Sequence, residues 1–341
     1  MTKAKAYIGT SVVCLLGIIA LLYYYFFTGF STCEQTSYIY VDDDDTPDSV
    51  FVKFTPFGSK HSLTALRTLL RHSNYMEHVP TGRFAIEPGD GVLNVFRRLK
   101  NGQQSPIMLT IPESRTTDIL AGRLSRKLML DSLTIAQALS DNAFCQNWGE
   151  GYDTCTIPAL FVPNTYEVYW NLSLDKFMER MVKEHKNFWN GERKQKAEML
   201  GLTPNEVCTL ASIIDEETAN NQEKPMIAGM YLNRLKKGMP LQADPTVKFA
   251  LKDFALRRIM NKHLTAESPY NTYKTTGLPP GPIKIASVKG IDAVLNAVGH
   301  DYLYMCAKED FSGTHNFAVT YKEHLQNAAR YAKALNERGI K

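Results

Sequence analysis

Three consecutive carboxylates, Asp215, Glu216 and Glu217, follow a largely apolar segment of the chain. A carboxyl group beside apolar side chains loses part of its hydration, which disfavours the charged form and raises its pKa. Such a group can stay protonated near neutral pH and donate a proton as a general acid. These three residues are therefore the first candidates for acid–base chemistry.

The helix that must carry the carboxylates has a clear start signal. Thr203 is followed by Pro204 and, three residues after the threonine, by Glu206. This is the pattern of a capping box with proline at the first helical position. We therefore expect a helix that begins at residue 204 and runs through the carboxylates. Its predicted apolar stripe consists of Val207, Leu210, Ala211 and Ile214.

Helix phase separates the three carboxylates. At roughly 100° per residue, Glu217 falls at one edge of the apolar stripe, Asp215 falls at the opposite edge and Glu216 points away. We expect Glu216 to be solvated and Glu217 to be partly desolvated, with a raised pKa. The alternative is that Glu217 only pairs with an Arg or Lys at the end of the helix.

Polar residues suited to ligand contacts follow in later segments. Apolar residues at helical spacing predict a second helix, which contains Asn233 and ends near Gly238. Gln242 and Asp244 come next, and because Asp244 precedes a proline we expect an extended or turn conformation there. Residues 268–283 are dense in Tyr, Asn, Thr, Pro and Gly. Such a rigid loop suits a sugar, but the alternative is a structural loop over the core.

Several separated motifs occur together between about residue 202 and residue 324. In chain order they are Ala211-Ser212-Ile213-Ile214-x-x-Glu217-Thr218, Asn233-Arg234-Leu235, Gly238-Met239-x-Leu241-Gln242-x-Asp244-Pro245-Thr246, Tyr270-Asn271-Thr272-Tyr273, Gly277-Leu278-Pro279-Pro280-Gly281-Pro282-Ile283, Tyr302-Leu303-Tyr304 and Gly313-Thr314-His315-Asn316-Phe317. With these motifs in this order, the chain closely resembles the MltG/YceG-like family of endolytic murein transglycosylases. The resemblance covers most of the chain beyond its apolar N-terminal segment.

The resemblance implies a reaction and a catalytic residue. The family cleaves the bond between N-acetylmuramic acid and N-acetylglucosamine without water, because the muramyl C6 hydroxyl attacks C1 and leaves a 1,6-anhydro end. Ordinary glycosidases use two carboxyl groups, whereas this reaction can proceed with one acid/base. The family's glutamate directly precedes the motif threonine, which corresponds to Glu217 here. Asp215 stands where Glu is usual and Glu216 where Lys is common, which questions a supporting role for residue 215 but not the activity.

The resemblance also implies a substrate and partners. The substrate would be the nascent peptidoglycan glycan strand, cleaved endolytically so that elongation ends, with peptidoglycan synthases as candidate partners. Two hypotheses in which the protein is not an enzyme stay open. It could be a peptidoglycan-binding module or a scaffold of the wall-synthesis machinery. The candidate substrate-positioning residues are Asn233, Gln242, Tyr270, Asn271 and Tyr273, with Asp244 as a candidate to orient one of them.

Residues 7–30 carry no formal charge and are numerous enough to span a bilayer as a helix. Lys3 and Lys5 precede this run, whereas five acidic residues follow it by residue 45. The positive-inside rule then places the N-terminus in the cytoplasm and the catalytic part in the periplasm or outside the cell. We therefore expect a single-pass protein of the cell (inner) membrane, with a cleaved signal peptide and a lipoprotein attached through Cys33 as less favoured alternatives.

The expected fold is α+β, with one transmembrane helix, a small LysM-like α+β subdomain and a mixed α/β catalytic domain of the YceG-like type. Within the subdomain, the β-branched and aromatic run at residues 50–54 predicts a strand. The expected boundaries are a cytoplasmic tail at 1–6, the transmembrane helix at 7–30, a solvated linker at 31–49, the LysM-like subdomain at 50–112, a connecting region at 113–200 and the catalytic domain at 201–341.

Composition and spacing argue against other site types. The formal charge of +4 over 341 residues, without a basic cluster, disfavours nucleic-acid binding. The six cysteines include no C-x-x-C pair, so a zinc site is not expected. No other metal and no cofactor is implied by the sequence. Cys145 and Cys155 either close a short disulfide loop or remain separate thiols. The histidines checked for metal-ligand spacing, and predicted to be loop or core residues, are His263, His300, His315 and His324.

Overall fold

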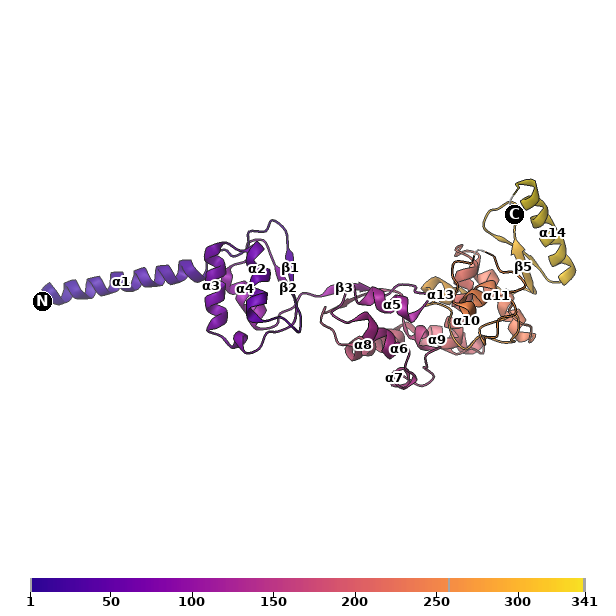
Figure 1. Ribbon diagram of the computed structural model, residues 1–341, viewed down its shortest axis with the longest axis horizontal. Helices are drawn as coiled ribbons and strands as arrows, with labels where there is room; N and C mark the ends of the chain where they lie inside the picture. Colours follow the sequence, from indigo (N-terminus) through magenta and orange to yellow (C-terminus); the bar gives the residue numbers. More distant parts are fainter. Residues whose placement is uncertain (1, 257, 340–341) are drawn as a thin grey trace. The chain divides into compact units, whose positions relative to one another are not determined.

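The computed structural model describes residues 2–256 and 258–339, and the side chains among them from residue 7 onward. Residues 1, 257 and 340–341, and the side chains of Lys3 and Lys5, lie outside this description, and with them part of the predicted tail and catalytic domain. Two compact units make up the chain (Figure 1). The N-terminal unit is the chain up to Leu109 with Arg126–Met129 and Glu167–Leu172, and the C-terminal unit is Thr110–Ser125, Leu130–Tyr166 and the chain from Ser173.

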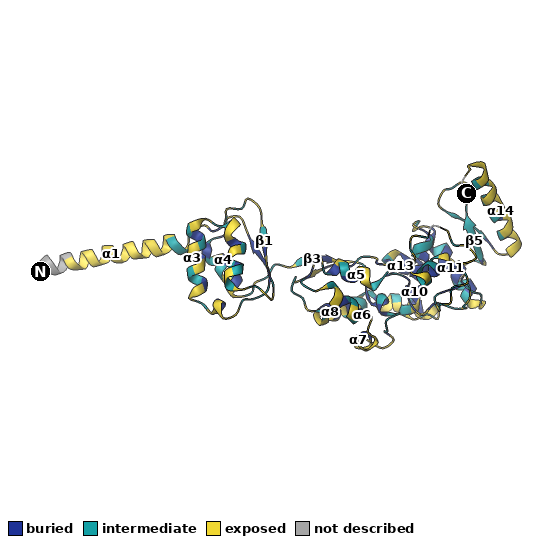
Figure 2. Cartoon of the chain, viewed as in Figure 1, coloured by how far each residue is buried: buried dark blue, intermediate teal, exposed yellow. Residues whose placement is uncertain are grey.

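The N-terminal unit begins with α1 (Thr2–Phe26), a largely apolar helix. Its segment Tyr7–Phe26 has a mean hydropathy of 2.0 and is exposed along most of its length (Figure 2). About 20 apolar residues span the hydrocarbon core of a bilayer. Among the described residues, α1 is the one helix long and apolar enough for this, and by length and composition it is a membrane anchor or a signal sequence.

The rest of the N-terminal unit is a small α+β body. β1 (Ser37–Val41) pairs antiparallel with β2 (Gly82–Ile86), from Ser37 opposite Ile86 to Val41 opposite Gly82. Buried side chains of both strands and of the helices, such as Phe54, Leu66 and Phe84, form its core. The LysM-like character of this body stays a prediction. Its helices are α2 (Pro47–Phe54), α3 (Lys60–Arg71) and α4 (Val92–Lys100), with single 3-10 turns at Thr55–Phe57 and Asn74–Met76.

Two local expectations differ from the structure in this unit. The expected linker at 31–49 contains β1, whose Ile39 and Val41 are buried in the core, because β2 supplies a pairing partner more than forty residues away. The strand expected at 50–54 is wrong. These residues belong to α2, because Thr46 and Ser49 form a capping box and a proline occupies the first helical turn.

The C-terminal unit is mainly helical. β5 (Tyr304–Ala307) and β6 (His315–Ala318) pair antiparallel, and α14 (Tyr321–Glu337) packs against both strands. β3 (Ile107–Thr110) and β4 (Thr165–Val168) form a further two-stranded sheet, and the division between the two units passes through both of these strands. The remaining helices are α5 (Thr117–Leu124), α6 (Ser132–Leu139), α7 (Asn142–Gln146), a 3-10 helix at Ile157–Leu160, α8 (Leu174–Phe188), α9 (Gly191–Met199), α10 (Pro204–Glu217), α11 (Lys224–Lys236), α12 (Asp244–Leu251) and α13 (Val288–Leu295).

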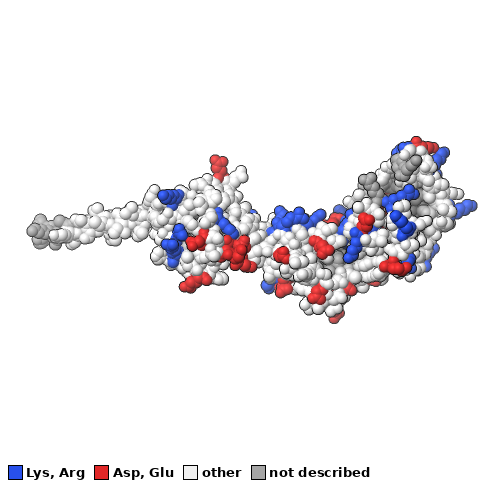
Figure 3. Space-filling model, in the orientation of Figure 1, with Lys and Arg blue, Asp and Glu red and all other residues white. Residues whose placement is uncertain are grey.

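Acidic and basic side chains lie close to one another over both units on the face shown in Figure 3. Several form exposed pairs, such as Arg67 with Asp48 at 3.0 Å and Lys176 with Glu179 at 3.0 Å. Exposed pairs of this kind contribute little to stability. The stability of the fold therefore depends mainly on its buried groups.

α10 is the centre of the core of the C-terminal unit. It starts with the predicted capping box of Thr203 and Glu206 and with Pro204 in its first turn. All residues from 207 to 214 are buried, and the helix packs against α11, α12 and α13. The predicted stripe of Val207, Leu210, Ala211 and Ile214 is buried as expected, but the residues between them are buried as well, because a helix at the centre of a core is enclosed on every side.

A buried ion pair ties α10 to two neighbouring helices. Asp215 accepts hydrogen bonds from Lys224 Nζ (2.7 Å) and from the backbone N–H (2.7 Å) and hydroxyl (2.8 Å) of Ser287, the N-cap of α13. The side chains of Asp215 and Lys224 are 2% and 7% exposed. Gly290 leaves room for this carboxylate, since a Cβ there would lie 2.5 Å from Asp215 Oδ1. These contacts give Asp215 a structural role.

Replacing Asp215 by Ala should destabilise the protein by about 3–5 kcal/mol, because the ammonium group of Lys224 is left buried without its partner. Urea unfolding followed by circular dichroism measures the change. The double variant Asp215→Leu, Lys224→Met removes both charges and should recover most of the loss. Unchanged stability of the single variant would contradict this role.

Candidate active site

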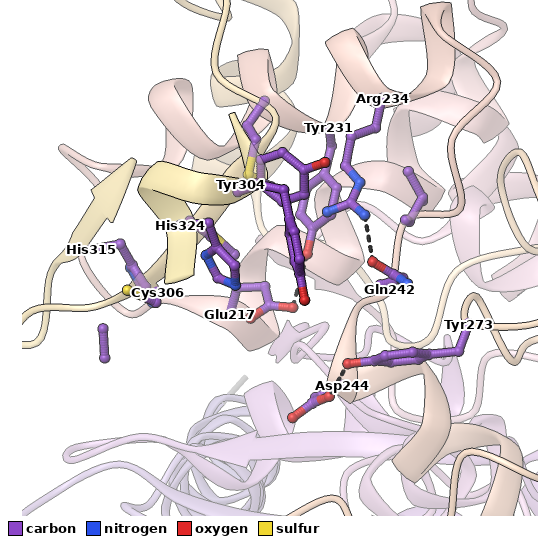
Figure 4. Close-up of a pocket in the computed structure, with 15 residues that line it drawn as sticks. Glu217, Tyr231, Arg234, Gln242, Asp244, Tyr273, Tyr304, Cys306, His315 and His324 are labelled. Carbon is purple, nitrogen blue, oxygen red and sulfur yellow. Dashed lines mark hydrogen bonds between the residues drawn. The ribbon is translucent and has the colours of Figure 1, made fainter. Parts of the chain in front are cut away.

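Glu217 lines a pocket of about 420 Å³ in the C-terminal unit (Figure 4). α10 contributes Glu217, and α11 contributes Tyr231 and Arg234. The β5–β6 hairpin and α14 close another side with residues that include Tyr304 and His324. The pocket therefore brings together side chains that lie about a hundred residues apart in the sequence.

The carboxyl group of Glu217, at the end of α10, is poorly hydrated. Burial raises the pKa of Glu217 to about 7, and the negative charge of Asp244 acts in the same direction. Tyr231 opposes the shift, because its hydroxyl donates a hydrogen bond of 3.0 Å to Oε1. Protein atoms enclose the carboxyl group, while the residue keeps a partly exposed edge toward the pocket. Glu217 is thus a carboxyl group that a ligand can reach and that is partly protonated at neutral pH.

The other two carboxylates do not line the pocket. Glu216 pairs with Arg115 at 2.8 Å and with Lys284 at 3.6 Å, and its side chain is 20% exposed. The expectation that Glu216 is solvated is therefore wrong, because two cations hold it against the protein. Asp215 is buried in its ion pair, as described above. The alternative hypothesis was that Glu217 pairs with an Arg or Lys at the end of the helix. In the structure the Glu217 carboxyl group instead accepts a hydrogen bond from the Tyr231 hydroxyl.

Asp244 and Tyr273, two of the predicted substrate-positioning residues, line the pocket as a pair. The Tyr273 hydroxyl donates a hydrogen bond of 2.6 Å to Asp244 Oδ1. Asp244 does not lie in an extended segment or turn, as expected, but begins α12, where Pro245 occupies the first turn. Proline is favoured there because its missing N–H would have no helical partner. The pair presents an oriented hydroxyl and a carboxylate to the pocket.

Gln242, a third predicted residue, lines the pocket in a left-handed backbone conformation. Its φ of 52° is unfavourable for a residue with a Cβ, by about 1–2 kcal/mol. Arg234 Nη2 donates a 2.6 Å hydrogen bond to Oε1 of Gln242. The backbone N–H of Gln242 donates to the backbone carbonyl of Thr272. Arg234 is only 6% exposed and also donates to two backbone carbonyls. Since Arg234 orients the amide oxygen, the NH₂ group of Gln242 is the end suited to donate to a ligand.

The other three predicted residues lie outside the pocket lining and support the segments around it. Asn233 donates to the carbonyls of residues 300 and 302, at 2.6 and 3.1 Å. Asn271 is fully buried and donates to two carbonyls of its own loop, both at 2.9 Å. Tyr270 packs on Phe249, with ring centroids 4.7 Å apart. The contacts of these three residues therefore favour a structural role over direct contact with a sugar.

Several pocket residues were not predicted as site residues. Tyr304 and His315 occur in motifs of the sequence, and those motifs are the signal that points to them. Tyr231 resembled one more apolar residue of a helix stripe, and His324 had no local signal. His324 stacks on Tyr304, with ring centroids 5.5 Å apart. The unpredicted polar or aromatic residues of the lining are Tyr231, Arg234, Tyr304, Tyr321, His315 and His324.

The described part of the chain holds no group of three or more His, Cys, Asp or Glu side chains that could bind a metal ion. Cys145 is buried and Cys155 is half-buried, and both are free thiols in the structure. Of the two alternatives for this pair, the structure therefore shows the separate thiols.

Comparisons with known proteins give relatives over most of the chain. The model of the YceG-like family matches residues 39–330. The endolytic murein transglycosylase of Bacillus subtilis (strain 168) is 30% identical over 277 residues, 75% of this chain and 74% of the relative. The enzyme of the same name from Streptococcus pneumoniae (strain ATCC BAA-255 / R6) is 24% identical over 295 residues, 77% of this chain and 52% of the relative. The chain thus spans about half the length of the streptococcal relative.

A solved structure shows the same fold. The crystal structure of a yceG-like protein from Listeria monocytogenes matches with a TM-score of 0.57 and 23% sequence identity. The match covers 86% of this chain and 99% of that chain.

The raised pKa of Glu217 should make stability depend on pH. Between about pH 4.5 and pH 7 the folded protein keeps a proton that the unfolded chain has released, so this residue lowers stability as the pH rises through that window. Glu217→Gln cannot ionise and should therefore be more stable than the wild type at pH 8, by about 1–3 kcal/mol. At pH 4 the two should be equally stable.

Thermal unfolding at pH 4, 6 and 8 measures this difference. Glu216→Gln is the matched control, since it changes the neighbouring, ion-paired carboxylate and should give no gain at pH 8. A Glu217→Gln effect that is the same at all three pH values would contradict the desolvation of Glu217.

Proposed function

This chain belongs to the YceG-like family, and from that premise we propose that it is a lytic transglycosylase that cleaves peptidoglycan between N-acetylmuramic acid and N-acetylglucosamine. Relatives named endolytic murein transglycosylases support this enzyme class and this substrate. The observation that carries the proposal is Glu217, a carboxyl group with a pKa raised to about 7 that lines a pocket. Such a group can both give and take a proton near neutral pH.

In the proposed mechanism Glu217 acts first as an acid and then as a base. The protonated carboxyl donates its proton to the glycosidic oxygen as the bond from that oxygen to the muramyl C1 breaks. The C6 hydroxyl of the same muramyl residue bonds to C1, and the Glu217 carboxylate accepts the hydroxyl proton. The products are a strand that ends in 1,6-anhydro-N-acetylmuramic acid and a free N-acetylglucosamine 4-hydroxyl, and Glu217 is protonated again.

The environment of Glu217 suits both steps. Burial favours the protonated acid at the start, while the Tyr231 hydrogen bond stabilises the carboxylate formed by the first proton transfer. Gln242, Asp244 and Tyr273 are the predicted residues that the pocket lining retains for contacts with the sugar. Asn233, Tyr270 and Asn271 are proposed to act through the segments that they hold together.

A membrane location fits this substrate. α1 is proposed to be an uncleaved anchor with its N-terminus in the cytoplasm, so that the C-terminal unit works on the outer side of the membrane. Glycan strands are made at that surface, and endolytic cleavage there would end their elongation. Peptidoglycan synthases, which extend the same strands, are the proposed neighbours.

Glu217→Gln tests the central residue. It keeps the size and the hydrogen bond to Tyr231 but removes the acid, and should lower the formation of 1,6-anhydro ends from purified glycan strands about 10²–10⁴-fold. Mass spectrometry of the products measures this. Glu216→Gln, outside the pocket, is the matched control and should stay within about threefold of the wild type.

Other outcomes identify other functions. Undiminished anhydro product from Glu217→Gln would rule out this mechanism. Wild-type products with reducing ends instead of anhydro ends would indicate hydrolysis with Asp244 as a second carboxylate. Wild-type binding of strands without any product would favour a peptidoglycan-binding module.

The pH profile tests the pKa separately. Above about pH 7, kcat/KM should fall about tenfold per pH unit, because the acid form of Glu217 is lost. Tyr231→Phe removes the hydrogen bond that lowers the pKa of Glu217, so this fall should begin at higher pH. If kcat/KM of Tyr231→Phe falls at the same pH as that of the wild type, a group other than Glu217 sets the pH profile.

A further inference from the structure

Glu223 is a buried carboxylate that the proposed mechanism does not use. The residue is 8% exposed and accepts three hydrogen bonds. The backbone N–H of His315 donates to Oε1 at 2.6 Å, His315 Nδ1 lies 2.9 Å from Oε2, and the Thr218 hydroxyl donates to Oε2 at 3.3 Å. A buried carboxylate is tolerated only when hydrogen bonds replace its hydration. Here two of the three come from a single residue, His315.

The double contact fixes the ring of His315. The backbone and the ring are held by the same carboxylate, so the side chain has little freedom to turn. An ionised Glu223 carboxylate can only accept, so its contact with Nδ1 requires the hydrogen on Nδ1, and in the neutral ring this makes Nε2 the acceptor. A carboxylate on one ring nitrogen also makes the other a better acceptor. The His315 side chain is 16% exposed and lines the pocket of Glu217.

Glu223 also joins His315 to the proposed acid. Thr218, its third donor, directly follows Glu217 and is the C-cap of α10. One carboxylate therefore links the turn after the acid to the first residue of β6, almost a hundred residues later. In the view of Figure 4, His315 lies on the other side of Glu217 from Asp244 and Tyr273. Glu217, His315, Asp244 and Tyr273 all line the same pocket.

We propose that His315 binds the glycan strand, by accepting at Nε2 a hydrogen bond from a sugar hydroxyl or from an N-acetyl N–H, and that Glu223 is the residue that positions it. This inference rests on the proposed function and names a second contact for the same substrate. With Asp244 and Tyr273 in the same pocket, the contact holds the strand at Glu217. A group that holds the reacting atoms in line raises kcat as well as affinity.

Two substitutions separate binding from structure. His315→Asn places an amide NH₂ where Nδ1 of His315 lies, so it keeps the hydrogen bond to Glu223 but lacks the Nε2 acceptor. His315→Gln places an amide oxygen where Nε2 of His315 lies, so it keeps an acceptor in the pocket but loses the side-chain hydrogen bond to Glu223. The proposal therefore expects activity in the order wild type, His315→Gln, His315→Asn. A purely structural His315 would give the reverse order for the two variants.

The measurement is kcat/KM for 1,6-anhydro ends, with the full-length protein in detergent and purified glycan strands. We expect His315→Asn to lose at least about tenfold, which corresponds to about 1.4 kcal/mol, with a thermal midpoint near that of the wild type. His315→Gln should lose less activity but more thermal stability. A wild-type kcat/KM for His315→Asn, or more activity in His315→Asn than in His315→Gln, would overturn the proposal. So would unfolding of His315→Asn, because that variant keeps the structural bond.

Binding in the absence of turnover gives a second readout. In the Glu217→Gln background, adding His315→Asn should weaken the Kd for glycan strands about tenfold, which a structural role would not do. An unchanged Kd would overturn the binding role. The two proposals fail differently: wild-type protein that forms no anhydro ends refutes the function, whereas active wild type with an equally active His315→Asn refutes only the role of His315.

Discussion

The pocket depends on one constraint, a carboxyl group kept out of water at the end of a helix that is itself buried. α10 is enclosed by α11, α12 and α13, so its last residue emerges inside the unit and not at its surface. Desolvation disfavours the charged form of Glu217, and the Tyr231 hydroxyl partly offsets that cost. The balance leaves the pKa close to neutrality. A fully hydrated carboxylate would rarely be protonated, and one without Tyr231 would release its proton less readily.

Buried charged groups hold this arrangement together. Asp215 with Lys224 joins α10 to α11 and α13, Arg234 joins α11 to the Gln242 segment and to Leu303, and Glu223 joins the end of α10 to β6. Burying a charge costs several kcal/mol unless all its hydrogen bonds are made. An arrangement that moves one segment away would leave at least one charge unpaired. The same groups that are costly to bury therefore restrict the pocket walls to one position around Glu217.

Local signals predicted well where a few neighbouring residues decide the structure. The capping box at Thr203 placed the start of α10, and Gly238 placed the end of α11. Signals that need a distant partner were misread. β1 looked like part of a linker because β2 lies elsewhere in the chain. Residues 50–54 are rich in β-branched and aromatic residues and so resembled a strand, although the cap at Thr46 begins a helix. Helix phase placed Glu216 in solvent because it cannot show Arg115 or Lys284.

The amino-acid sequence by itself determined the family and the apolar N-terminal helix, and it singled out Glu217 as the proposed acid, because motif order and local capping are properties of neighbouring residues. It could not decide which polar side chains surround Glu217. Asn233, Tyr270 and Asn271 are as polar in the sequence as Gln242 and Tyr273, yet their contacts hold other segments together. Tyr231, Arg234, Tyr304, His315 and His324 face the pocket only because α11, the β5–β6 hairpin and α14 pack around the end of α10. Tertiary structure alone decided this, because desolvation and hydrogen bonding depend on distances between atoms, and the number of residues between two side chains does not reveal that distance.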